Sequence, residues 1–169
     1  IWLNEGFASY GEVLWYEQDN GALGRRRYVE SQVESYFNWQ QYEGLSSVYD
    51  PNYLFGGAVY DKGSVVLDML RSLLGDDAFF EAVALYVDRY AHSNATTSDL
   101  EEVFSEVYGS ELSWFFEQWV YRAGDPALSV GWTKSGLGDG LYQLNMVIRQ
   151  DTADLWRLPL QVQWRQDGQ

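Results

Sequence analysis

Apolar side chains recur every three or four positions over the first 124 residues of the chain, which is the spacing of amphipathic helices. The spacing predicts a helical region built from several helices joined by short polar segments. The clearest predicted helices cover residues 5–19, 25–41, 59–74, 76–90 and 111–122.

Glycines and a capping pattern predict where these helices begin and end. Asn20-Gly21 and Gly75 predict breaks between neighbouring helices, because glycine tolerates the left-handed backbone that often ends a helix. Ser98 followed by Glu101 is a capping-box pattern, which predicts the start of a further helix that Gly109 ends.

The period changes from about 3.6 to two after Pro126, which is typical of strands. The alternation predicts strands over 127–134, 141–150 and 158–165, and Asp139-Gly140 predicts a hairpin turn between the first two. We therefore expect a mainly α chain, in which a helical region precedes a few antiparallel strands with one apolar face.

Composition narrows the classes of function. The 169 residues carry 11 Lys and Arg against 25 Asp and Glu, a net charge of −14. So negative a chain is a poor partner for nucleic acid, because binding phosphates needs clustered cations. No apolar run approaches the roughly 20 residues that span a membrane. With no Cys and a single His, the chain offers no thiolate zinc site and no site that needs two histidines.

Two residues are candidates for chemistry. Glu5 lies in the first turn of the first predicted helix, beside Gly6, which leaves room for another group to approach. The pattern alone allows a metal ligand or a general base, but favours a carboxylate that only complements the helix dipole. Tyr60, near the start of a later helix, is by pattern alone a tyrosine with its hydroxyl in water.

The opening motif changes this balance. The run Trp2-Leu3-Asn4-Glu5-Gly6-Phe7-Ala8-Ser9-Tyr10 resembles the zinc aminopeptidases of the gluzincin class, family M1. In that family a WLNEG-type sequence follows the HExxH motif, and its Glu is the third zinc ligand beside the two histidines. The resemblance implies that Glu5 binds zinc.

Two further motifs follow in the family's order. Val59-Tyr60-Asp61-Lys62-Gly63 resembles the Tyr-x-Lys-Gly segment, which implies that Tyr60 donates a hydrogen bond to the oxyanion of the tetrahedral intermediate. The segment 119–130 resembles the junction that joins the catalytic domain to a β-sandwich. The resemblance therefore implies two regions, a helical lobe of a thermolysin-like catalytic domain over 1–124 and the start of a β-sandwich over 125–169.

Two motifs of the family are missing. The chain contains no HExxH and no Gly-x-Met-Glu-Asn segment, which in the family helps to bind the substrate's α-amino group. Both precede WLNEG in the family. We therefore expect the C-terminal part of a catalytic domain, from a zinc-dependent enzyme that removes N-terminal residues from peptides. With one zinc ligand, the isolated chain should bind zinc weakly or not at all and should be inactive.

The competing hypothesis is a non-catalytic helical module that binds other proteins. The two hypotheses differ in geometry, since the enzyme needs Glu5 and Tyr60 at one cleft and the module predicts that they lie far apart. We also expect exposed apolar surface at Trp2, Leu3, Phe7 and the strands, and self-association through it.

Overall fold

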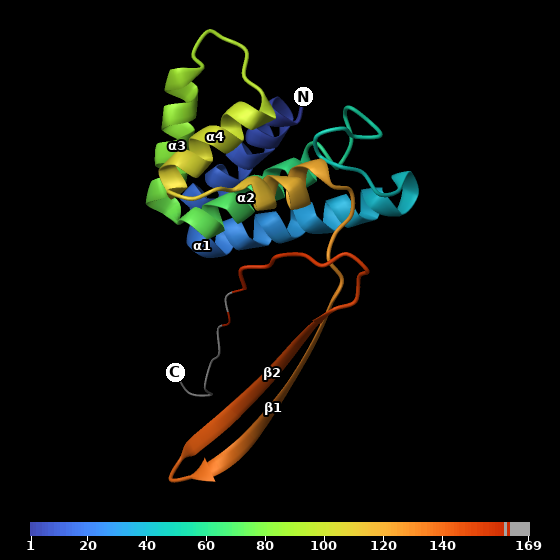
Figure 1. Ribbon diagram of the computed structural model, residues 1–169, viewed down its shortest axis with the longest axis vertical. Helices are drawn as coiled ribbons and strands as arrows, with labels where there is room; N and C mark the ends of the chain where they lie inside the picture. Colours follow the sequence, from blue (N-terminus) through green and yellow to red (C-terminus); the bar gives the residue numbers. More distant parts are fainter. Residues whose placement is uncertain (161, 163–169) are drawn as a thin grey trace. The chain divides into compact units, whose positions relative to one another are not determined.

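The computed structural model describes residues 1–160 and 162. It contains two compact units, Ile1–Gly124 and a second unit that begins at Asp125 (Figure 1). The first is helical and the described part of the second contains one antiparallel pair of strands. The expected mainly α chain with a few antiparallel strands is therefore confirmed. No helix in the described ranges is long and apolar enough to cross a membrane.

Helix α1 (Trp2–Glu43) consists of two segments that meet at Gly21, whose φ of 65° and ψ of −163° are not helical. The second segment folds back on the first. The amide Nε2 of Gln32 donates to the Ser9 carbonyl at 3.4 Å, and the rings of Tyr16 and Tyr28 stack with centroids 4.2 Å apart. The break predicted at Asn20-Gly21 is thus confirmed, and it creates an antiparallel helical hairpin.

Four more helices complete the first unit together with a short π-helix. They are α2 (Asp61–Leu74), α3 (Asp76–Arg89), α4 (Thr97–Tyr108), α5 (Ser113–Phe116) and the π-helix η1 (Glu117–Tyr121). Aromatic rings join three of the helices in the core, since Phe79 of α3 meets Tyr10 of α1 edge-on at 5.6 Å and Phe104 of α4 at 5.7 Å. Burial of these rings is a main source of stability for the unit.

One local prediction is wrong, and a second is confirmed only in part. The capping box at the start of α4 is formed by Thr96 and Asp99, two residues before the predicted pair Ser98 and Glu101. Both pairs have the same spacing, so the pattern could not separate them. The last predicted helix, 111–122, is divided into α5 and η1, and the carbonyl of Val120 accepts two backbone hydrogen bonds from the loop that follows α1.

In the second unit, β1 (Leu128–Gly138) pairs with β2 (Leu141–Gln150), with Trp132 opposite Met146. Asp139 and Gly140 both have positive φ, 49° and 77°, as the predicted tight turn requires. The third predicted strand, 158–165, is not present at 158–160 or 162, and its other positions lie outside the described residues.

Candidate active site

Helices α1 and α2 cross with their backbones in contact at two buried glycines. A Cβ added to Gly6 would lie 3.2 Å from the carbonyl carbon of Gly63, and one added to Gly63 would lie 3.2 Å from the Cα of Gly6. Glu5 directly precedes the first glycine, and Tyr60 lies three residues, about one helical turn, before the second. The crossing therefore brings the two candidate residues to one place.

Glu5 and Tyr60 interact at this crossing, and both side chains are half-buried. The pKa of Tyr60 is raised above its ordinary value, first by burial of the phenol, then by the negative charge of Glu5 and by a hydrogen bond between the two side chains. A tyrosine with a raised pKa keeps its proton at neutral pH, so Tyr60 is a hydrogen-bond donor beside a carboxylate.

A half-buried aromatic ring supports the turn that leads to Tyr60. Gly56 and Gly57 lie against the indole of Trp39, where added Cβ atoms would come within 2.7 Å and 3.0 Å of the ring. The backbone N–H of Tyr60 then donates to the Gly56 carbonyl at 3.3 Å, and the Tyr60 carbonyl accepts from Ser64 at 3.0 Å. The two glycines are therefore required for the close approach of this turn to Trp39.

Lys62 is a functional candidate that the sequence motif contained but gave no role. Its side chain is 3% exposed. Its Nζ donates to the carbonyl of Gly124 at 2.8 Å and to the hydroxyl of Tyr36 at 3.3 Å. The signal in the sequence was the lysine of the motif itself, at the polar start of the helix, which does not reveal its acceptors.

Carboxylates continue along α1 and α2 beside the pair. The hydroxyl of Tyr28 donates to Glu12, and that of Ser35 donates to Asp61 at 2.8 Å. Burial raises the pKa of Asp61, the Ser35 hydrogen bond opposes this, and the charge of Glu12 adds to it. The polar surface next to Tyr60 is therefore acidic.

Trp2, at the start of the motif, is buried rather than exposed as predicted. It is 4% exposed, and its Nε1 donates to the hydroxyl of Thr97 at 2.9 Å. This bond joins α1 to the first residue of α4, while Leu3 and Phe7 are half-buried. The expected apolar patch at the chain's start is therefore much smaller than predicted.

The described residues provide part of a metal site at most. Among them, no three His, Asp or Glu side chains come together as a metal site would require. His92, the single histidine, is exposed in a turn with φ of 60°. A carboxylate oxygen such as that of Glu5 suits zinc, but a catalytic zinc needs about three protein ligands. Glu5 therefore fits one ligand position and the chain's described part does not supply the others.

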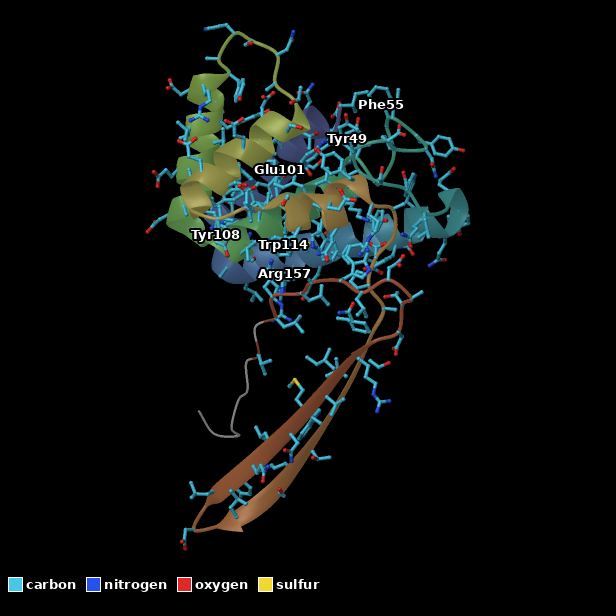
Figure 2. The ribbon with its side chains drawn as sticks, in the orientation of Figure 1. Tyr49, Phe55, Glu101, Tyr108, Trp114 and Arg157 are labelled. Carbon is cyan, nitrogen blue, oxygen red and sulfur yellow. The ribbon has the colours of Figure 1, made fainter. Side chains whose placement is uncertain are left out.

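An acidic hollow of about 810 Å³ lies apart from this pair, along α4 and the turn after it. Its carboxylates are Glu101, Glu102, Glu106 and Glu111. Figure 2 labels Glu101, whose pKa is raised by burial and by the charges of Glu111 and Glu117. No basic side chain lines this hollow, and none of the motif residues does.

The first unit is thus a helical unit in which Glu5 and Tyr60, each from its own motif, lie side by side. The family profile described as "Peptidase family M1 domain" matches residues 1–119. The chain therefore belongs to peptidase family M1, and the resemblance of its motifs to that family is confirmed.

Relatives in this family are named as aminopeptidases. Aminopeptidase N of Lactococcus lactis subsp. lactis is 29% identical over 182 residues, covering 97% of this chain and 20% of that protein. Aminopeptidase M1-C of Oryza sativa subsp. japonica is 34% identical over 141 residues, covering 77% of this chain and 16% of that protein. The chain thus spans a fifth or less of the length of these two relatives.

Proposed function

We propose that this chain is the C-terminal helical part of the catalytic domain of a zinc-dependent aminopeptidase, which hydrolyses N-terminal residues from peptides. Residues 1–124 form the helical lobe, and residues 125–169 begin a β-sandwich. The observation that supports this is the meeting of Glu5 and Tyr60, from two family motifs, where Gly6 and Gly63 touch.

Glu5 supplies the third zinc ligand in this proposal, and the two histidines come from a part of the enzyme outside this chain. Its half-buried carboxylate is held at the end of a rigid helix crossing, which suits a ligand that must keep its orientation. When bound, the zinc polarises the scissile carbonyl and activates water. The isolated chain, with one ligand, binds zinc weakly or not at all and is inactive.

Tyr60 stabilises the oxyanion in this proposal. A phenol is protonated over the neutral range, so Tyr60 can donate a hydrogen bond where negative charge develops. The helix start that carries it is fixed by backbone hydrogen bonds to Gly56 and from Ser64. A donor that is already in place costs no reorganisation during the reaction.

The alternative, a non-catalytic interaction module, gives no reason for these two side chains to meet. It predicted that Glu5 and Tyr60 lie far apart, whereas they interact at the α1–α2 crossing. Nothing in the described residues favours the module over the enzyme fragment.

Kinetics of the full-length enzyme test the two roles separately. Tyr60→Phe should lower kcat by about 100-fold to 1,000-fold with little change in KM, because one oxyanion donor is lost. Glu5→Gln should instead lower the zinc content measured by atomic emission. Tyr42→Phe, at an 87% exposed position, is the control and should keep full activity. Unchanged kcat in Tyr60→Phe would exclude the oxyanion role.

The isolated chain provides a second test. With added zinc, it should not hydrolyse an aminoacyl chromogenic substrate. Turnover above that of its own Glu5→Gln variant would show that the 169 residues hold a complete site, and would overturn the fragment proposal.

A further inference from the structure

The first turn of α2 lies in a small framework of buried and half-buried groups. On the side before Tyr60, the indole of Trp39 lies against Gly56 and Gly57. Trp39 also stacks on Tyr36, with centroids 6.2 Å apart. The turn that precedes Tyr60 is therefore held by packing against rings of α1.

Lys62 holds the other side of the turn. Its ammonium lies 5.0 Å from the centroid of the Tyr36 ring, where a cation is attracted by the aromatic face. The same ammonium donates to the Tyr36 hydroxyl and to the carbonyl of Gly124, the last residue of the helical unit. One side chain thus joins the start of α2 to the second segment of α1 and to the end of the helical unit.

Burial of the Lys62 ammonium has an energetic cost that a role in packing alone does not explain. Burying an ammonium is unfavourable unless it is hydrogen-bonded, and a methionine or leucine would fill the same space without that penalty. A cation that needs fixed acceptors is instead sensitive to geometry, because its hydrogen bonds weaken steeply when distances or angles change. The hydrogen bonds of Lys62 therefore depend on where the first turn of α2 lies.

We propose that Lys62 is a positioning residue for Tyr60, holding the phenol against Glu5 by fixing the first turn of α2 to Gly124 and Tyr36. The catalytic relevance rests on the proposed function, but the geometric statement does not. Lys62 does not touch substrate in this proposal and acts through the backbone of the turn it shares with Tyr60, two residues earlier.

NMR of the isolated chain tests this without assaying activity. The readout is the NOE between the ring protons of Tyr60 and the side-chain methylene protons of Glu5, which falls with the sixth power of their separation. A shift of about 1 Å, the scale on which misplaced catalytic groups lose function, should lower this NOE by about threefold in Lys62→Met. Lys62→Arg keeps a cationic donor over the ring and should restore at least part of the signal.

The matched control is Arg71→Met. Arg71 lies on the same helix and is as buried as Lys62, with 4% of its surface exposed. Its partners Glu17 and Asp76 lie away from the first turn of α2. It should leave the NOE unchanged, even if it lowers the melting temperature by as much as Lys62→Met does. Equal NOE loss in both variants, or no loss in Lys62→Met, would overturn the positioning role.

A second variant covers the case in which Lys62→Met does not fold. Tyr36→Phe removes one acceptor of the ammonium and keeps the ring, and it should reduce the NOE by a smaller amount than the threefold loss. An unchanged NOE in this variant would then overturn the proposal. Absence of the NOE in the unsubstituted chain would contradict the proposed function's geometry instead, so the two failures are distinguishable.

Discussion

Burial of single polar groups determines much of the chemistry of the helical unit, and Tyr10 is the clearest example. Its side chain is 2% exposed, and its hydroxyl donates to Asp68 and accepts from Arg71, both at 3.5 Å. Burial raises the pKa of Tyr10 from 10.0 to about 12, although the nearby Arg71 opposes the increase. The folded chain therefore holds this proton more tightly than the unfolded chain does.

This difference predicts a loss of stability in alkali. As pH rises through about 10, Tyr10 ionises in the unfolded state but not in the folded state, so the unfolded state is favoured. The free energy of unfolding should be unaffected by Tyr10 below pH 10. It should then fall by up to about 1.4 kcal/mol per pH unit until about pH 12.

Tyr10→Phe should remove this part of the alkaline slope, as measured by urea unfolding at several pH values. Tyr42→Phe is the matched control for the loss of a tyrosine hydroxyl, because Tyr42 is exposed. If Tyr10→Phe keeps the slope of the unsubstituted chain, another group causes it.

The contact between α1 and α2 is the element on which the candidate site depends. Gly6 and Gly63 allow the two backbones to touch, and no other residue type fits this separation without movement of one helix. Gly11, one and a half turns further along α1, has no atom within 4 Å of the position of a Cβ. The two positions therefore form a matched pair on one helix.

Gly6→Ala should lower the free energy of unfolding by about 1–3 kcal/mol, because the added methyl group overpacks the crossing. Gly11→Ala should raise it by about 0.5–1 kcal/mol, since alanine favours the helix and meets nothing. Chemical denaturation measures both. A similar gain in both variants would mean that the helices do not touch at Gly6 in solution.

How far the sequence predicts these elements depends on whether their cause is local. The breaks at Gly21 and Gly75 were predicted because glycine's backbone freedom acts within one or two residues. The start of α4 was misplaced because the choice between two equivalent capping patterns depends on Thr97, which is buried and bonded to Trp2, 95 residues away. The π-helix η1 was missed because its Val120 carbonyl meets the backbone of Val48 and Tyr49 only in the folded chain.

The residues of the candidate site also divide into those that a local motif predicts and those whose contacts form only in the folded chain. Glu5 and Tyr60 were predicted from motifs, whereas the acceptors of Lys62 come from segments that no spacing rule relates to it. The ring of Trp39 against Gly56 and Gly57 is another contact of this kind. The motifs therefore contain Glu5, Tyr60 and Lys62, but they do not indicate the contacts that Lys62 and Trp39 make.

At the scale of the whole molecule, the two units differ in how their apolar side chains are buried. The helical unit has a core of buried apolar side chains, whereas β1 and β2 expose a face that includes Val130, Trp132, Leu144, Met146 and Ile148. Only three side chains between 128 and 150 are charged, namely Lys134, Asp139 and Arg149. A nearly neutral, apolar strand pair in an otherwise strongly acidic chain is a surface suited to self-association.

The isolated chain should therefore form concentration-dependent dimers or larger species through this face, as measured by sedimentation velocity. Trp132→Lys should shift the population toward monomer, because it places a charge at the centre of the apolar face. Thr133→Lys is the matched control on the opposite face of the same strand and should leave the population unchanged. A chain that stays monomeric at high concentration would contradict this prediction.

The touching glycines also limit how such a sequence can diverge. A methyl group on Gly6 meets the backbone of Gly63, and a methyl group on Gly63 meets the backbone of Gly6, so a larger residue at one position is not relieved by any change at the other. Each of the two positions, more than fifty residues apart, is therefore restricted to glycine on its own account.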